Sequence, residues 1–186
     1  MNIGIFGGTF DPWHVGHSAI VKKAFEQLGL DKIIVVPTTV NYYRADKRYL
    51  FTYDEKIKII QDFLVGTPNV EIDTVEKDKN GEWRTIDTLQ YFKDKYPNDR
   101  LFYIIGEDSY REFQTWTRWE DILKIAHLCV ANRGYDQFET NPVVPCLRID
   151  LGDDFEDSSA TNVRNKLIEE LIDMYLLDKE WYNKVK

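Results

Sequence analysis

The sequence predicts an α/β fold with one domain, in which a doubly wound parallel sheet carries helices on both faces. Short apolar runs alternate with segments of helical spacing along the chain, as strands and helices do in such folds. The length of 186 residues suits one domain. No repeat and no linker interrupts the alternation, so the elements are expected to form a single sheet.

The first part of the chain has the pattern of one βαβ unit. Residues 2–6 form a short apolar run that stops at two glycines, which is typical of a buried parallel strand entering a turn. Apolar residues at helical spacing follow His17, and Gly29 ends that pattern. Residues 33–36 form a second buried strand. Such units are right-handed in nearly all folds, so these elements begin a parallel sheet.

The same alternation continues toward the C-terminus. The elements expected there, in chain order, are a helix marked by Ile57, Ile60 and Leu64, a weaker strand near 70–75, a polar turn at 78–82, a helix near 86–96, a strand at 101–105, a short helix at 119–126 and strands at 128–131 and 146–151. Thr52 or Asp54 is the expected cap of the first of these helices. A last helix from Val163 to Tyr175 has the clearest helical stripe. This order predicts a Rossmann-like sheet.

The composition excludes several classes of protein. A hydrophobic fraction of 43% is ample for a buried core and too high for a disordered chain. The net charge of -8 argues against broad affinity for nucleic acids or anionic membranes, because both need clustered cations. No signal peptide and no run of about 18 apolar residues is visible. We therefore expect a cytoplasmic protein without nucleic-acid or membrane partners, and a homo-oligomer is compatible with the sequence.

The two cysteines do not suggest a metal site. Cys129 and Cys146 lie far apart, with no CxxC pattern and no neighbouring histidine, so a zinc site is not expected. Both lie in apolar surroundings, and we interpret them as reduced thiols of the core.

Three unusual segments fall at predicted ends of strands or at the start of a helix. They are residues 7–17 after the first strand, 106–108 after the fourth strand and 158–164 at the start of the last helix. Ligands of open parallel sheets bind at the carboxyl ends of the strands, near the point where the strand order reverses. We therefore expect the three segments to meet at one crevice.

The first segment combines two glycines with two histidines. Gly7 and Gly8 allow backbone amides to approach a phosphate closely. His14 and His17 are three residues apart and share one face if a helix begins near residue 14. Two imidazoles at a helix N-terminus can bind phosphate oxygens and stabilise the charge that develops on them. The alternative is a capped helix start with a structural histidine, but two of the chain's three histidines in one loop favour a phosphate site.

The last segment also suits an anion. Ser159 or Thr161 is a good N-cap residue, and exposed amides at such a helix end bind anions. Arg164 lies in the first turn, where a cation opposes the helix dipole, so an anionic ligand could compensate it. A structural ion pair of Arg164 with Asp157 or Glu156 is an equal alternative.

The remaining candidates each have a structural alternative. An acid such as Asp108, just after Gly106 at a strand end, commonly meets a ribose hydroxyl or a metal ion, although acidic loops are also ordinary. Trp116 and Trp119 are three residues apart, so they either pack into the core or stack on a planar base or pyridine.

Two motifs resemble those of the nucleotidyltransferase superfamily. Residues 8–17 match the pattern GxFDPxHxGH, and residues 159–164 match Ser-[Ser/Ala]-Thr-x-[Ile/Val]-Arg. Further similarity at residues 85–89, 105–108 and 130–133, and around the two tryptophans, resembles the bacterial nicotinate-mononucleotide adenylyltransferases. The similarity covers essentially the whole chain and implies one nucleotidyltransferase domain over residues 1–186.

This resemblance implies adenylyl transfer from ATP to nicotinate mononucleotide, which gives deamido-NAD and pyrophosphate in NAD biosynthesis. It implies ATP as co-substrate and Mg²⁺ held mainly by ATP oxygens and water, without metal ligands from the protein. The residues it assigns are His14, His17 and Arg164 to catalysis, Gly7, Gly8, Thr9, Phe10, Gly106, Asp108, Arg133, Ser159 and Thr161 to ATP, and Asp11, Thr85 and Trp116 to the acceptor. We add Arg44 to the acceptor residues as a replacement for a lysine of the family.

Two departures from the family pattern lie on the acceptor side. Residues 41–44, Asn-Tyr-Tyr-Arg, stand where the family carries Pro-Pro-His-Lys, and Trp83-Arg84 replaces a small residue and a tyrosine. Arg44 could take over the phosphate contact of the lysine. The alternatives are another small-molecule acceptor, namely nicotinamide mononucleotide, phosphopantetheine or a phosphorylated polyol with CTP, or a nucleotide-sensing module that has lost turnover.

Overall fold

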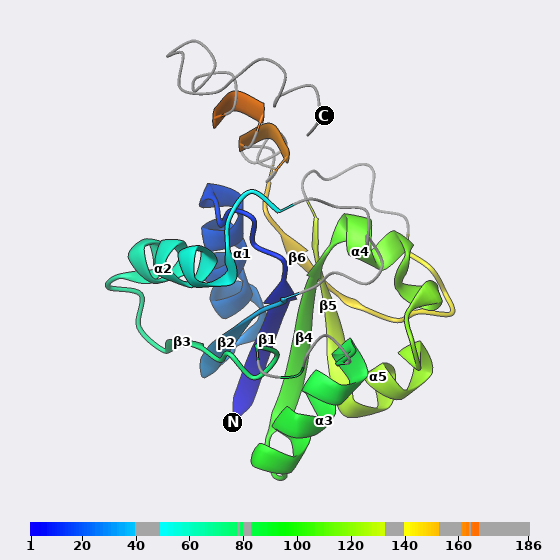
Figure 1. Cartoon of the computed structure of the whole chain (residues 1–186). Coiled ribbons are helices and arrows are strands. Elements are labelled where there is room, and N and C mark those ends of the chain that lie inside the picture. The colour runs from blue at the N-terminus through cyan, green and yellow to red at the C-terminus, as the bar shows by residue number, and fades with distance from the viewer. Residues whose placement is uncertain are drawn as a thin grey trace.

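A six-stranded parallel sheet forms the centre of the molecule (Figure 1). The structure is a computed structural model, and it describes residues 1–39, 49–77, 79, 83–132, 140–152, 161–163 and 165–167. The strands are β1 (Asn2–Gly8), β2 (Lys32–Pro37), β3 (Val70–Ile72), β4 (Arg100–Gly106), β5 (Ala126–Asn132) and β6 (Leu147–Asp150). They lie in the order β3-β2-β1-β4-β5-β6, and every neighbouring pair is parallel. This order confirms the doubly wound fold, and its direction reverses between β1 and β4.

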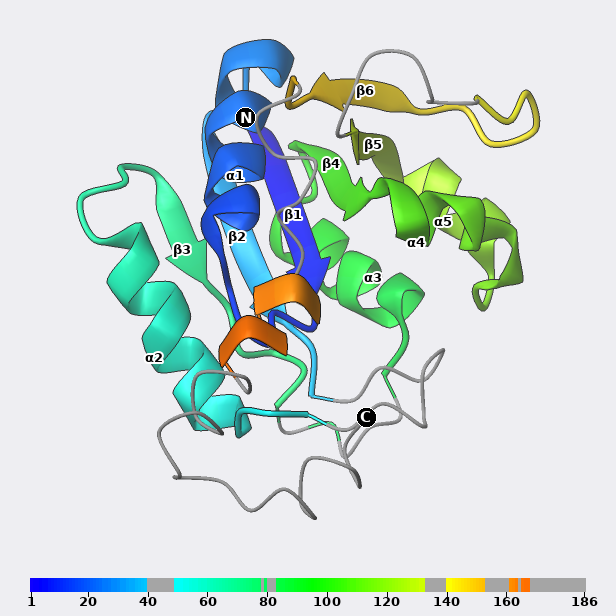
Figure 2. The same cartoon turned by 90° about the horizontal axis from the view of Figure 1, so that it is seen from above.

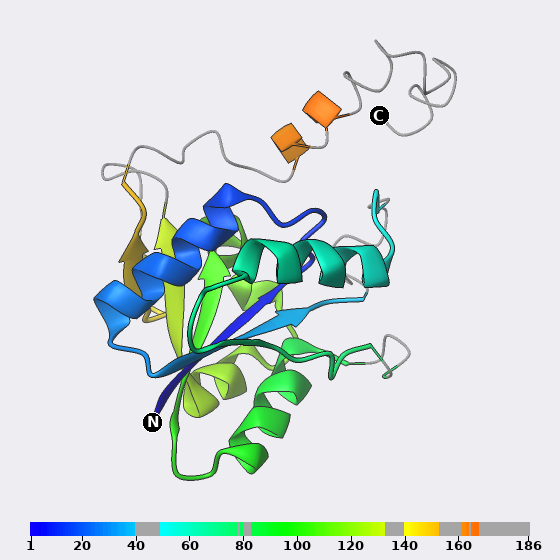
Figure 3. The same ribbon diagram turned by 90° about the vertical axis from the view of Figure 1, so that its left-hand side faces the viewer.

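Helices cover both faces of the sheet. They are α1 (Val15–Leu28), α2 (Tyr53–Leu64), α3 (Thr85–Lys95), α4 (Glu107–Arg111), the 3₁₀ helix η2 (Phe113–Thr115) and α5 (Trp119–Ile125). Figure 3 shows α1 and α2 above the sheet, with α3 below it, and Figure 2 shows the same layers from another direction. Residues 161–163 and 165–167 are also helical, and they lie beyond the edge at which the strands end.

Each face of the sheet has its own apolar core. On β4, Tyr103 and Ile105 pack toward α3 and α5, whereas Phe102 and Ile104 pack toward α1. Because both faces are buried, the central strands are apolar at nearly every position, and this explains why their positions can be predicted from the sequence.

Several boundaries differ from the prediction. β1 continues through Gly7 and Gly8, because these glycines still pair with β2. β3 has only three residues, Val70–Ile72. Thr52 caps α2, and Glu55 completes a capping box there. The helices α4 and η2 were not expected. The polar turn at 78–82, apart from Lys79, and the last helix after residue 167 lie outside the described residues.

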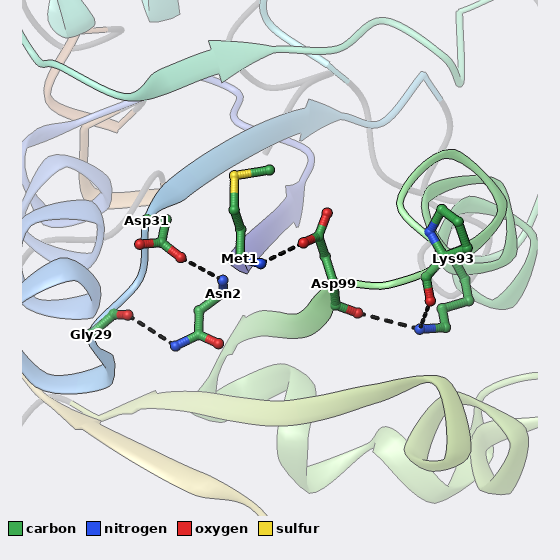
Figure 4. Close-up of polar contacts among 7 residues, drawn as sticks. Met1, Asn2, Gly29, Asp31, Lys93 and Asp99 are labelled. Atoms are coloured by element: carbon green, nitrogen blue, oxygen red, sulfur yellow. Dashed lines mark hydrogen bonds and ion pairs between the residues drawn. The ribbon is translucent and has the colours of Figure 1, made fainter.

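The edge at which the strands begin is closed by polar contacts (Figure 4). The amino group of Met1 forms an ion pair with Asp99. The backbone amide of Asn2 donates to Asp31 Oδ2 at 2.7 Å, and the side-chain amide of Asn2 donates to the carbonyl of Gly29 at 3.1 Å. This edge is thereby tied together, and the candidate site lies at the opposite edge. Within the described part of the chain, no helix is long and apolar enough to cross a membrane.

Candidate active site

The loop between β1 and α1 is a compact, aromatic-packed turn. A Cβ atom on Gly8 would come within 2.8 Å of the Phe10 ring, so only glycine fits there without a shift. Phe10 itself has a φ of 46° and is buried. Its ring packs against Phe6 at 5.1 Å and against Trp13 at 4.9 Å between ring centroids. The loop is therefore held in one shape at the carboxyl end of β1, next to the point where the strand order reverses.

The structure brings the two histidines of this loop together at the start of α1. His14 is the N-cap residue, and its Nδ1 accepts the backbone N–H of Gly16 at 3.1 Å. His17 Nδ1 accepts the backbone N–H of His14 at 3.2 Å. The two rings are stacked obliquely, with centroids 3.8 Å apart and planes inclined by 36°.

These hydrogen bonds determine where each imidazole carries its proton. A nitrogen that accepts a hydrogen bond has no proton, so the neutral forms of His14 and His17 both carry it on Nε2. Each ring can therefore donate one hydrogen bond from Nε2–H. The first turn of α1 contains no acidic residue that would compete for its positive end. Two imidazoles held at the positive end of a helix are suited to bind an anion.

Asp11, expected on the acceptor side, is only 1% exposed. Its two carboxylate oxygens accept the backbone amides of Leu50 at 3.0 Å and Phe51 at 2.9 Å. These bonds hold the chain that leads into α2 against the β1–α1 loop. Lys56 on α2 is 2% exposed; burial lowers the pKa of Lys56, and the nearby charge of Asp11 partly offsets that effect.

The carboxyl end of β4 lies beside that of β1, because the two strands are paired in parallel. Gly106 is the N-cap of α4, and Asp108 is exposed in its first turn. Asp108 is thus placed on the same edge of the sheet as the histidine pair.

Thr85 and Trp116 lie on the other face of the sheet. Thr85 is the first residue of α3 and is partly buried. Trp116 follows η2 and packs against Phe113 at 5.3 Å and edge-on against Tyr103 at 6.3 Å between centroids. The indole therefore belongs partly to the core, as one of the two interpretations of the tryptophan pair requires.

Three polar residues that no sequence motif marks, Thr38, Glu76 and Thr88, are joined by hydrogen bonds. Glu76 accepts hydrogen bonds from the hydroxyls of Thr38 at 2.6 Å and Thr88 at 2.7 Å. Burial raises the pKa of Glu76, although both hydroxyl bonds act to lower it. No local pattern indicates this cluster, because its members come from three separate segments.

The remaining predicted residues are covered only in part. Arg44, Arg133, Ser159 and Arg164 lie outside the described residues. Thr161 is exposed and already helical, so it is not the N-cap of that helix. Among the residues that the structure describes, no group of three or more His, Cys, Asp or Glu side chains could hold a metal ion.

Comparison with known proteins gives one consistent result. The cytidylyltransferase-like family matches residues 5–166. A probable nicotinate-nucleotide adenylyltransferase of Albidiferax ferrireducens is 39% identical over 70% of this chain, and the match spans 65% of that relative's length. The nicotinate-nucleotide adenylyltransferase of Bacillus subtilis is 31% identical over 88% of this chain and 84% of its own.

A solved structure shares the fold. The nicotinic acid mononucleotide adenylyltransferase of Plasmodium falciparum, complexed with NaAD, superimposes with a TM-score of 0.73 at 18% identity, over 88% of this chain and 82% of that one.

Proposed function

The chain belongs to the cytidylyltransferase-like family and to the nicotinate-nucleotide adenylyltransferases, and we propose that it transfers the adenylyl group of ATP to nicotinate mononucleotide. The products are nicotinate adenine dinucleotide (deamido-NAD) and pyrophosphate, which makes the reaction a step of NAD biosynthesis in the cytoplasm. The observation that carries the proposal is the histidine pair, whose rings are 3.8 Å apart with both Nδ1 atoms bonded to backbone amides.

The histidine pair supports a role at the triphosphate of ATP. The Nε2–H groups of His14 and His17 donate to phosphate oxygens, and the backbone amides of Thr9 and Phe10 lie in the same loop. The N-terminal end of α1 adds a positive potential at this point. Because the donors are fixed before ATP arrives, they stabilise developing charge without having to reorganise.

The chemical step needs positioning more than proton transfer. A phosphate oxygen of nicotinate mononucleotide attacks the α-phosphorus of ATP in line, and a new P–O bond forms. The bond from the α-phosphorus to the oxygen that bridges it to the β-phosphorus breaks, and pyrophosphate leaves with that electron pair. The attacking phosphate is already ionised at neutral pH, so no general base is required. Alignment and charge neutralisation account for catalysis.

The other predicted residues complete the proposal. Ser159, Thr161 and Arg164 hold the β- and γ-phosphates, whereas Gly106, Asp108 and Arg133 line the adenosine side. On the acceptor side, Arg44 takes the phosphate, and Thr85 and Trp116 border the pyridine ring. Mg²⁺ enters as part of the MgATP substrate, and this fits a site whose described donors are imidazoles and backbone amides rather than a carboxylate cluster.

Pyrophosphate release over a panel of acceptors tests the proposal. The panel contains nicotinate mononucleotide, nicotinamide mononucleotide and phosphopantetheine with ATP, and a phosphorylated polyol with CTP. We expect the highest kcat/KM with nicotinate mononucleotide. If pyrophosphate is released with neither nicotinate mononucleotide nor nicotinamide mononucleotide, the proposal is wrong. If the protein binds ATP tightly but releases no pyrophosphate with any acceptor, it is a nucleotide-sensing module instead.

A further inference from the structure

Glu76 connects the segment just after β2 with the beginning of α3. It lies between β3 and α3, and each of its carboxylate oxygens accepts one hydroxyl. Thr38, just after β2, donates to Oε2 at 2.6 Å. Thr88, in α3, donates to Oε1 at 2.7 Å. The carboxylate therefore forms a two-sided bridge between the end of β2 and the beginning of α3.

The Thr38 end of this bridge is fixed to the loop that carries the histidines. The backbone amide of Thr38 donates to the carbonyl of Gly8 at 2.9 Å. Its carbonyl accepts a hydrogen bond from the buried ammonium group of Lys56 at 3.1 Å. The amide, the carbonyl and the hydroxyl of Thr38 are thus all hydrogen-bonded, and these bonds fix the position of Thr38 relative to β1.

The Thr88 end of the bridge adds a polar contact to α3, which packs on the sheet through Ile86, Leu89 and Phe92. Thr88 lies three residues after Thr85, so both are on the same side of the helix. A hydroxyl within a helix can bond back to the carbonyl four residues earlier, but the Thr88 hydroxyl donates to Glu76. This bond restrains rotation of α3 about its axis, and with it the direction in which Thr85 faces.

A carboxylate is a costly group to use for packing alone. Burial of Glu76 disfavours its charged form, as the raised pKa shows, and its two hydroxyl bonds offset this only in part. An apolar side chain would fill the same space at lower cost, but it would not join two hydroxyls in a defined direction. The free-energy cost of burying the Glu76 carboxylate has a reason if the reaction requires Thr38 and Thr88 to keep a fixed relative position.

We propose that Glu76 is a positioning residue that aligns the acceptor-binding end of α3 with the ATP-binding loop, through Thr88 on one side and Thr38 on the other. The inference rests on the proposed function. In-line transfer requires that the attacking phosphate oxygen of the acceptor be aligned with the α-phosphorus of ATP. A small displacement of the acceptor therefore lowers the rate of transfer. The ATP side does not depend on this bridge, because His14 and His17 are held by hydrogen bonds within their own loop.

The test separates the KM values of the two substrates. Thr88→Val keeps the shape of the side chain and removes the hydroxyl, and we expect the KM for nicotinate mononucleotide to rise about tenfold while the KM for ATP stays within a factor of about two. Thr88→Ser retains a hydroxyl and restores the wild-type value. Glu76→Leu, which can neither accept nor donate a hydrogen bond, shifts the same KM in the same direction. The double variant is no worse than Glu76→Leu alone, because the leucine has already removed the partner of the Thr88 hydroxyl.

Asp31→Asn is the matched control. Its carboxylate also accepts a hydrogen bond, from the amide of Asn2, but at the opposite edge of the sheet (Figure 4), so both KM values should remain unchanged. If Thr88→Val leaves the KM for nicotinate mononucleotide unchanged, or raises both KM values together with a loss of thermal stability, the positioning role is wrong. If the wild-type protein itself releases no pyrophosphate with nicotinate mononucleotide, the proposed function fails instead.

Discussion

The two histidines differ from ordinary surface histidines in that each ring is fixed through Nδ1 by a backbone amide. That bond selects the tautomer and leaves Nε2–H as the donor. From the sequence alone, a spacing of three residues predicts only that the two histidine side chains lie near each other. The fixed direction of both rings makes His14 and His17 suited to phosphate oxygens, and it depends on the turn that begins α1.

Replacement of His17 by alanine should impair turnover far more than folding. The variant loses one charge-stabilising donor, and we expect kcat/KM for ATP to fall about 100-fold, as measured by pyrophosphate release. His127→Ala is the matched control, because His127 is exposed near the beginning of β5 and packs on Phe102. A His17→Ala enzyme with full turnover would remove this residue from the mechanism.

Glu76 should give the protein a distinctive dependence of stability on pH. Its pKa is raised in the folded state above the ordinary value of 4.5, so the folded state binds more protons than the unfolded state between these two values. The free energy of unfolding therefore loses the contribution of this group as pH rises from 4.5 through the folded-state pKa. Urea unfolding of wild type and Glu76→Gln should show the stability difference moving in favour of the variant over that window. A difference independent of pH would contradict the assignment.

The roles of some residues near the site cannot be predicted from the sequence, because their contacts form only when distant segments come together in the fold. The positions of Thr38, Glu76 and Thr88 are far apart along the chain, and each residue type is ordinary in its own segment. Lys56 lies in an amphipathic helix, where a lysine is normally exposed, yet it is 2% exposed. By contrast, the histidine pair has a local signal, because its spacing of three within a glycine-flanked loop already places both rings on one face.

Among the elements, the β1–α1 loop depends most strongly on its exact residues. β1 keeps its pairing with β2 through Gly7 and Gly8, so the strand delivers its last residues directly to the site. The aromatic rings of Phe6, Phe10 and Trp13 fill the space beneath the loop. Any side chain on Gly8 competes with Phe10 for that space.

Gly8→Ala should therefore lower both stability and activity. Its Cβ would lie 2.8 Å from the ring of Phe10, which is buried and cannot swing into solvent freely. We expect a loss of about 1–3 kcal/mol in the free energy of unfolding, measured by urea denaturation, and a higher KM for ATP. Gly106→Ala serves as the control for stability alone, because nothing lies within 4 Å of its added Cβ. Equal stabilities of the two variants would show that the loop tolerates a side chain at residue 8.

The predictability of the elements follows from their burial and length. The central strands are apolar on both faces, the apolar spacing and Gly29 mark α1, and Thr52 is a good N-cap residue for α2, so the positions of these elements are evident from the sequence. The capping of α1 by His14 is seen only in the structure. The helices α4 and η2 have only five and three residues, too few for a periodic pattern, and they were missed. Their formation depends on packing of Tyr110 and Phe113 against the core.

At the scale of the whole molecule, the strand order brings segments that are distant in sequence to one edge of the sheet. β1 and β4 are neighbours at the point where the order reverses, which places the histidine loop beside Gly106 and Asp108. The opposite edge is closed by the contacts of Met1 and Asn2 (Figure 4). A net charge of -8 is compatible with anionic substrates because the attraction is local to the N-terminus of α1.

The fate of the α-phosphorus tests the central claim most directly. The purified protein is incubated with MgATP labelled at the α-phosphorus and with nicotinate mononucleotide, and the products are separated and identified by mass. Adenylyl transfer predicts that the label appears in nicotinate adenine dinucleotide and that the pyrophosphate released is unlabelled. Label recovered only in ATP, ADP or AMP, with no dinucleotide formed, would contradict the account.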